Sequence, residues 1–220
     1  MQDPSTIYIP PGYGRISFGR VELKNIFVAV GALTLAFTIF LLGGLRSMVS
    51  GNVSLFDILY AAAVSLIAVL SGFMFHELAH KFVAQRSGAW AEFRAHPMGL
   101  LIGVVISLLG VIFVIPGAVY IQGMISRKQN GLISLAGPAT NLALGGVFIA
   151  LFMAAGQSLL GLGFYWIGMI HFLLAAFNML PIPPLDGSKV LRWNVPAYVL
   201  VFGVSIIMVA LMFTGALIRL

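Results

Sequence analysis

Residues 58–80 read ILYAAAVSLIAVLSGFMFHELAH, an uncharged apolar run from Ile58 to Phe75 that continues directly into His76-Glu77-Leu78-Ala79-His80. A helix rises 1.5 Å per residue, so an apolar run of this length can cross most of a bilayer core. Ionisable side chains in hydrocarbon cost free energy, so three of them at one end of such a helix require a compensating role. The stretch therefore predicts a membrane helix that carries a functional site.

The rest of the chain has the composition of a membrane protein. Of its 220 residues, 60% are hydrophobic and 8% are charged, and the mean hydropathy is +1.07. Soluble domains are roughly a quarter charged, which excludes an ordinary soluble, disordered or disulfide-rich secreted protein. The sparse basic residues do not form a nucleic-acid surface. Four more runs are long enough to cross a membrane: Ile26–Leu45, Leu132–Gly156, Leu159–Leu180 and Val195–Ile218.

A sixth apolar run, Gly99–Ile121, is interrupted by Pro116-Gly117, and the basic residues indicate whether it crosses. If it crosses, the Lys and Arg residues divide seven to five between the two sides of the membrane. If it enters and returns, they divide ten to two, with Arg46 and Arg219 alone on the far side. Basic residues concentrate on the cytoplasmic side. We therefore predict an all-α polytopic membrane protein with about five transmembrane helices, one re-entrant or hairpin segment and a cytoplasmic N-terminus.

The stretch His76–His80 has the spacing of a zinc hydrolase. Residues four apart share one face of a helix, so His76 and His80 can bind the same metal ion. Glu77 can then act as general base toward a water at that metal. The alternative is a group of polar side chains that snorkel at a helix end beside Lys81 and Arg86. Cys is absent, which excludes thiolate ligands and thiol catalysis.

A catalytic zinc site usually has three protein ligands, so a third ligand is expected elsewhere in the chain. Asp186 closes Asn178-Met179-Leu180-Pro181-Ile182-Pro183-Pro184-Leu185-Asp186-Gly187, where three prolines interrupt the helix that starts near Leu159. With five crossings, Asp186 and His80 lie near the same leaflet. With six, they lie about a membrane thickness apart. The other candidates are Asp3, Glu22, Asp57, Glu92, His96 and His171.

A membrane-embedded HExxH followed by N-x-x-P-x-x-P-x-D-G resembles the site-2 protease family of intramembrane zinc metalloproteases, over roughly residues 26–187. The resemblance implies that His76, His80 and Asp186 bind one zinc ion per chain and that Glu77 activates the attacking water. It also implies a catalytic role beside the metal for Asn178. The Gly-Pro stretch Ala136–Asn141 is similar to the family's core helix, where Asn141 faces the site or forms an interhelical hydrogen bond.

The resemblance also implies two membrane-associated strands near the site, at Ala91–Arg94 and Ala118–Gln122. The second would hold an unwound substrate segment by edge pairing. Asn141 and four strand residues are therefore the expected substrate-binding positions, the four being Gly117, Ala118, Val119 and Tyr120. The sequence departs from better-known members in its apolar insertion Gly99–Val114 and in lacking a PDZ or CBS module. We expect an N-terminal extramembrane segment at 1–24 and one metalloprotease domain at 25–220, with a catalytic core at about 55–190.

These features predict an endopeptidase that cleaves transmembrane segments of single-span membrane proteins, with its active-site opening on the cytoplasmic side of the cell membrane. Its partners are then those substrates and the lipid bilayer, and homo-oligomerisation is left open. The alternative is a metal transporter or a non-proteolytic metal-binding membrane protein, for which His and Asp within spans would also serve. An HExxH protease of another type, with a later Glu as third ligand, is excluded because no Glu follows Glu92.

Overall fold

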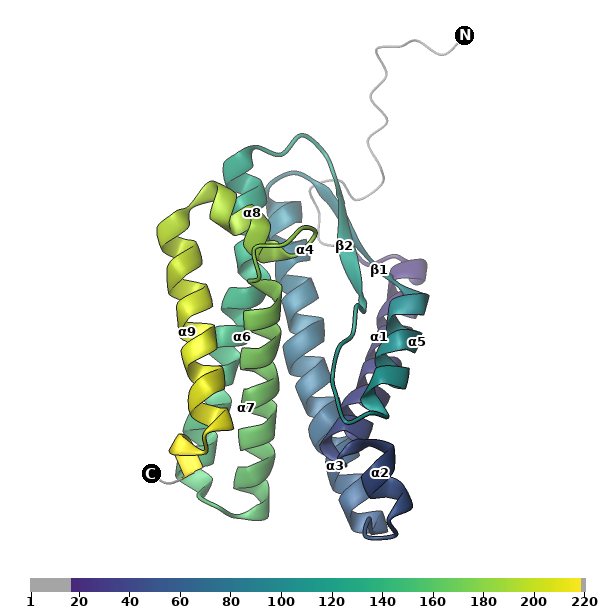
Figure 1. The fold of residues 1–220 in the computed structure, drawn as a ribbon. Coiled ribbons are helices and arrows are strands. Elements are labelled where there is room, and N and C mark those ends of the chain that lie inside the picture. Colours follow the sequence, from purple (N-terminus) through teal and green to yellow (C-terminus); the bar gives the residue numbers. More distant parts are fainter. Residues whose placement is uncertain (1–16, 219–220) are drawn as a thin grey trace.

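The computed structural model describes residues 17–218, so most of the expected extramembrane segment lies outside the described residues. Within this range the chain forms a bundle of helices with a small two-stranded sheet at one end (Figure 1). Five helical stretches are long and apolar enough to cross a membrane. They are α1 (Arg20–Leu41), the continuous stretch Leu55–Arg86, α6 (Arg127–Ala155), α7 (Leu159–Asn178) and α9 (Val195–Phe213).

The stretch Leu55–Arg86 consists of three consecutive pieces. Helix α3 (Leu55–Ala68) leads into a π-helical segment, Val69–Met74, and α4 (Phe75–Arg86) follows and carries the HExxH residues. A π-helical turn inside a longer helix is rare and is frequent at functional sites. It ends here immediately before the turn that carries His76, and so sets the direction of that side chain.

Polar side chains at the helix ends define where the spans begin. The Ser54 hydroxyl accepts a hydrogen bond from the backbone of Asp57, whose carboxylate accepts one from Ser54 in return. Ser126 and Gln129 form the same reciprocal cap at the start of α6. Such caps satisfy backbone N–H groups that have no partner within the helix. They account for the observed starts of α3 and α6, a few residues before the apolar runs.

The apolar insertion lies between two paired strands, so it begins and ends at the same end of the helix bundle. Strand β1 (Trp90–Ala95) pairs antiparallel with β2 (Gly117–Gln122), and Ala95 lies opposite Gly117. Between them, α5 (Pro97–Ser107) packs along α1, and an extended segment leads back to β2. The Leu45 N–H donates to the Leu108 carbonyl at 2.8 Å, beside the short helix α2 (Gly44–Val49). The predicted hairpin is confirmed, because its two ends are paired strands.

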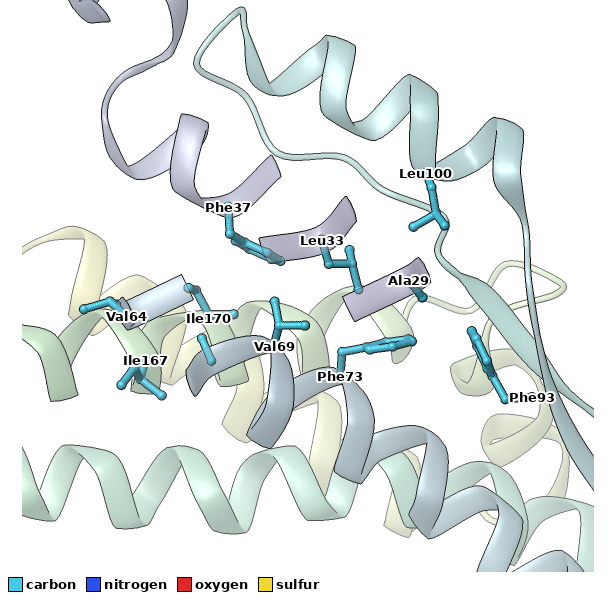
Figure 2. Packing of buried hydrophobic residues seen from close by; sticks show 11 residues of the cluster. Ala29, Leu33, Phe37, Val64, Val69, Phe73, Phe93, Leu100, Ile167 and Ile170 are labelled. Carbon is cyan, nitrogen blue, oxygen red and sulfur yellow. The ribbon is translucent and has the colours of Figure 1, made fainter. Parts of the chain in front are cut away.

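A buried apolar cluster joins this hairpin to the membrane helices. Figure 2 shows Ala29, Leu33 and Phe37 of α1 facing side chains from the α3–α4 stretch and from α7. Phe93 of β1 packs edge-on against Phe73, with ring centroids 5.5 Å apart. Leu100 of α5 belongs to the same cluster. This packing fixes the sheet against the stretch that leads into α4.

Candidate metal centre

The two histidines of α4 turn their side chains to one point. His76 Nε2 lies 3.0 Å from His80 Nε2, and both side chains are buried. The pair faces α6, which packs along α4. The four-residue spacing that suggested a shared ligand site therefore places two ring nitrogens together.

Asp186 completes the cluster from a distant part of the sequence. It is the first residue of α8 (Asp186–Trp193), which follows the proline-containing loop after α7. Its Oδ2 lies 3.4 Å from His76 Nε2 and 3.0 Å from His80 Nε2. Gly187 allows the loop to fold tightly here, because a Cβ at this position would lie 2.1 Å from the Met179 carbonyl oxygen. Burial by itself would raise the pKa of Asp186, but His80 and His76 hold that pKa well below its ordinary value.

The geometry of the three ligand atoms fits a zinc ion. Zinc ligands at about 2.0–2.1 Å in tetrahedral directions lie roughly 3.3 Å from one another. The three separations in the cluster are 3.0, 3.0 and 3.4 Å. Within residues 17–218, His76, His80 and Asp186 are the one group of His, Asp and Glu side chains close enough to hold a metal ion together. Two imidazoles and a carboxylate are also a donor set that suits zinc.

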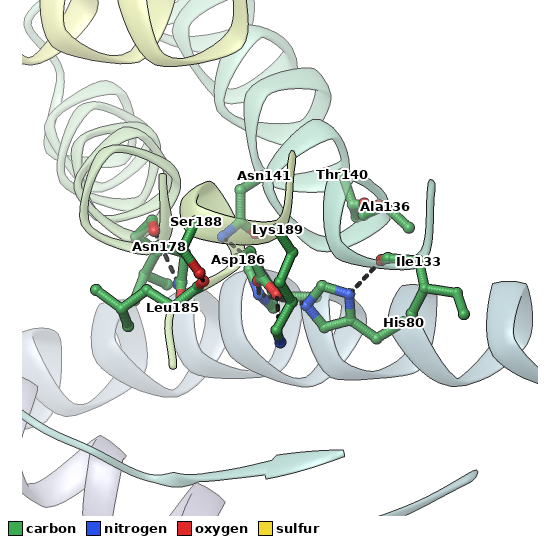
Figure 3. Close-up of polar contacts among 12 residues, drawn as sticks. His80, Ile133, Ala136, Thr140, Asn141, Asn178, Leu185, Asp186, Ser188 and Lys189 are labelled. Carbon is green, nitrogen blue, oxygen red and sulfur yellow. Dashed lines mark hydrogen bonds and ion pairs between the residues drawn. The ribbon is translucent and has the colours of Figure 1, made fainter. Parts of the chain in front are cut away.

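Each histidine is oriented by a group on α6. His80 Nδ1 donates to the Ile133 carbonyl at 2.6 Å, which leaves Nε2 unprotonated toward the cluster. The Asn141 amide lies 3.0 Å from His76 Nδ1, and its Oδ1 has no hydrogen-bond partner among the described residues. A half-turn of the amide brings Oδ1 to His76 Nδ1, where it accepts the ring proton and leaves Nε2 free. Figure 3 shows His80, Ile133, Asn141 and Asp186 converging from three helices.

Gly137 of α6 makes room for both imidazoles. A Cβ at this position would lie 2.5 Å from the Nε2 atoms of His76 and His80. Pro138 follows, inside the helix and buried, where it removes one backbone hydrogen bond. The Gly-Pro pair therefore allows close approach of α6 to α4, and a side chain at position 137 would collide with the Nε2 atoms of both histidines.

Glu77 lies on a neighbouring face of α4, beside the cluster. Its side chain lines a small cavity together with Lys81 of α4, Phe93 of β1 and Val119 of β2. Lys81 is only 1% exposed and forms a 2.5 Å ion pair with Glu22 of α1, which is fully buried. Lys81 therefore does not snorkel to the surface. The cavity places Glu77 beside the two strands and the Glu22–Lys81 pair.

The other predicted site residues lie on α7 and β2. The Asn178 side chain donates to the Leu174 carbonyl one turn earlier in α7, at 2.9 Å. Figure 3 shows it at the end of α7. Gly117, Ala118, Val119 and Tyr120 follow one another along β2. Val119 points into the cavity beside Glu77, whereas Tyr120 is exposed.

The remaining candidates for a third ligand lie away from the cluster. Asp57 caps α3, and Glu92 pairs with Arg94 on β1. His96 caps α5, where its Nδ1 accepts from the Gly99 N–H. His171 is buried in α7 and lies 3.0 Å from the Ser71 hydroxyl. Glu22 pairs with Lys81, as described above, and Asp3 lies outside the described residues.

Sequence reasoning missed two parts of this region. The Ile133 carbonyl carries no side-chain signal, and only the packing of α6 on α4 shows that it orients His80. The Glu22–Lys81 pair joins residues 59 positions apart. In the sequence, this pair is visible only as an acidic residue near the start of one span and a lysine after an HExxH motif. Neither residue type is specific for such a pair.

The fold and the cluster are those of a multi-pass membrane metalloprotein, and the comparisons with known proteins identify it as a metallopeptidase with zinc as its cofactor. The family model described as Peptidase family M50 matches residues 154–213, which include Asn178 and Asp186. The chain is 52% identical over 137 residues to "Putative zinc metalloprotease MJ0611" of Methanocaldococcus jannaschii, covering 60% of this chain and 70% of that protein. The chain belongs to peptidase family M50, the site-2 protease family.

More distant relatives carry the same description. The chain is 34% identical over 146 residues to Rip2 of Mycolicibacterium smegmatis, covering 57% of this chain and 56% of that protein. It is 32% identical over 151 residues to YwhC of Bacillus subtilis, covering 60% of this chain and 68% of that protein. Both relatives are named as zinc metalloproteases. No solved structure matches the chain at a significant level.

Proposed function

We propose that this membrane zinc protease cleaves the transmembrane segments of single-span membrane proteins near their cytoplasmic ends. The observation that carries the proposal is the position of the cluster. His76 and His80 lie within a membrane-spanning stretch, and Asp186 meets them from the loop after another span. A peptide bond can reach these residues only by entering the helix bundle at membrane depth. A transmembrane substrate already holds its peptide bonds there.

The chemistry follows from the residues around the cluster. His76, His80 and Asp186 would hold one zinc ion, which when bound supplies a Lewis acid for the scissile carbonyl and a water of lowered pKa. Glu77 takes a proton from that water and delivers it to the leaving amine. Asn141 and the Ile133 carbonyl keep the two imidazoles in the tautomer that this requires. We assign Asn178 to the substrate strand or the developing oxyanion, which requires its amide to leave the Leu174 carbonyl.

Strand β2 is the proposed site of substrate pairing. The outer edge of β1 is already used by α1, because Glu22 accepts from the Phe93 N–H and Asn25 from the Ala95 N–H, both at 3.0 Å. The free edge of the sheet is therefore that of β2, on the side of α4 (Figure 1). Gly117, Ala118, Val119 and Tyr120 would bind an unwound substrate segment there by strand addition. Helix-breaking residues in the substrate should favour cleavage.

The proposed domain is a single membrane-embedded unit, with the sheet and the metal centre opening toward the cytoplasm. The ten-to-two distribution of basic residues supports this orientation, and we place the protein in the cell membrane. The chain has no Cys, so single Cys substitutions give unambiguous thiol labelling. Cys at Arg94 and at Lys128 should react from the same side, and Cys at Asn52 from the other. Labelling of Arg94 and Lys128 from opposite sides would contradict the topology.

Proteolysis is tested with the purified protein and a panel of single-span reporter proteins in liposomes. Glu77→Gln should retain zinc and lower the cleavage rate by roughly 10²- to 10⁴-fold, because the general base is lost. Glu92→Gln, which changes a carboxylate outside the cluster, is the matched control and should cleave normally. Zinc release into the liposome lumen, equal for wild type and Glu77→Gln and without cleavage, would instead identify a transporter.

A further inference from the structure

A recess of about 490 Å³ on the metal-centre end of the molecule is lined by Arg127, Asn130, Lys189 and Arg192. Arg127 and Asn130 belong to the first turn of α6, and Lys189 and Arg192 belong to α8. The recess thus brings three cationic side chains together from two helices.

The walls of the recess are held together by direct contact of α6 with α8. Trp193 packs on the α6 backbone at Gly131, where a Cβ would lie 2.4 Å from the Trp193 side chain. The Arg127 guanidinium donates to the Arg192 carbonyl. The basic side chains therefore stand on a fixed frame and do not extend from separate flexible loops.

The positive charge of the recess is poorly compensated within the protein. Lys189 lies 3.8 Å from Asp186 Oδ1, a weak pairing, since the same carboxylate contacts both histidines. Neither Arg127 nor Arg192 forms an ion pair with a carboxylate in the described part of the chain. The positive end of the α6 dipole adds to the same field. Such a recess has the chemistry to bind an anion with several acceptor oxygens.

The position of the recess indicates which kind of molecule supplies the anionic group. The recess lies where α6 and α9 begin, at the polar end of two spans. Exposed apolar side chains continue from it along these helices, at Leu132 of α6 and at Val195 and Val199 of α9. Basic pockets between transmembrane helices at the cytoplasmic surface bind anionic lipid head groups. We propose that the recess binds a phosphate group, with the head group of an anionic phospholipid as its source.

The proposal is tested by titrating the detergent-solubilised, zinc-loaded protein with short-chain phosphatidylglycerol, short-chain phosphatidylcholine and inorganic phosphate. Phosphatidylglycerol should bind more tightly than phosphatidylcholine. The double variant Arg127→Gln/Arg192→Gln should weaken phosphatidylglycerol binding by roughly 25-fold, because each basic residue contributes about 1 kcal/mol. Lys128→Gln, on the same turn of α6 but outside the lining, should weaken binding by at most about 5-fold, the general attraction of one basic residue.

The arms of the experiment separate the sources of the phosphate. Weak binding of inorganic phosphate beside tight binding of phosphatidylglycerol identifies the lipid head group, and equal binding identifies a soluble phosphate compound. Unchanged phosphatidylglycerol binding in the double variant, or an equal loss in Lys128→Gln, overturns the proposal. The zinc content of the double variant, expected at the wild-type value, excludes misfolding as the cause of a loss.

Discussion

Helix α4 carries two buried polar clusters on neighbouring faces, and they differ in the charge that each supplies. On one face, His76, His80 and Asp186 bring together three electron-pair donors within 4.8 Å. On the other, Lys81 supplies a cation to Glu22, whose carboxylate also accepts from the backbone of Phe93 and Gly19. The first cluster has a distant cation, Lys189 at 3.8 Å from Asp186 Oδ1, whereas in the second Lys81 contacts the Glu22 carboxylate directly. The balance of donors and cations, rather than burial, separates a metal site from a structural ion pair.

The largest effect, on zinc content, is expected when one of the three proposed zinc ligands is removed. Asp186→Ala removes one of three ligands, so zinc content should fall from about one ion per chain to a small fraction, and reporter cleavage should fall to background. Asp57→Ala, which changes a carboxylate at the far end of the membrane-spanning stretch that carries His76 and His80, should keep its zinc. Metal analysis of the purified variants measures both. Full zinc occupancy in Asp186→Ala would show that Asp186 is not a zinc ligand.

Breaking the ion pair should cost stability and leave the metal in place. Lys81→Met leaves the Glu22 carboxylate buried without its cation, and such an uncompensated charge destabilises by about 3–5 kcal/mol. The free energy of unfolding in detergent measures this loss, with the exposed Lys128→Met as control. Zinc content should stay at the wild-type value. If Lys81→Met loses zinc while its stability is unchanged, the two clusters are not separate.

A smaller effect is expected from the residue that orients a ligand without binding the metal. Asn141→Ala removes the partner of His76 Nδ1 and should weaken zinc binding by about 10- to 100-fold. Thr140→Ala, on the same helix, removes only a bond to the Ala136 carbonyl and serves as the control. Competition with a chelator measures both affinities. Equal affinities in the two variants would show that the Asn141–His76 contact does not orient the ligand.

The smallest effect is expected when both partners of the ion pair become neutral. In Glu22→Gln/Lys81→Met, the Gln oxygen still accepts from the Phe93 N–H, and no charge remains buried. Stability should return to within roughly 1 kcal/mol of wild type, because neutral replacements of buried pairs are often tolerated. The same unfolding measurement applies. A double variant as unstable as Lys81→Met would show that the pair contributes more than charge compensation.

The pairing of His76 and His80 could be predicted from their local spacing, and the family resemblance singled out Asp186 as their partner. His76 and His80 are four residues apart on one helix, and Asp186 follows a helix break that three prolines mark. The hairpin was predictable from the distribution of Lys and Arg, which records the side on which each segment ends. Both signals can be read from the sequence without knowing which helices are in contact.

The contacts that support the cluster could not be predicted in this way. Glu22 and Lys81 meet only because α1 packs beside α4, and neither position stands out in its own stretch. The π-helical segment before His76 and the Ile133 carbonyl on α6 also depend on packing. The sequence indicated that Asn141 would face the site or another helix. Its place beside His76 Nδ1 comes from the approach of α6 that Gly137 allows.

The pairing of Ala95 with Gly117 means that the chain leaves the sheet and rejoins it at the same point. The residues between them can therefore change in number without altering the side of the membrane on which any later helix emerges. A segment with this property can be exchanged or lengthened in evolution as a unit, while the catalytic helices keep their orientation. The same position is the natural one at which to graft a reporter domain into this membrane enzyme.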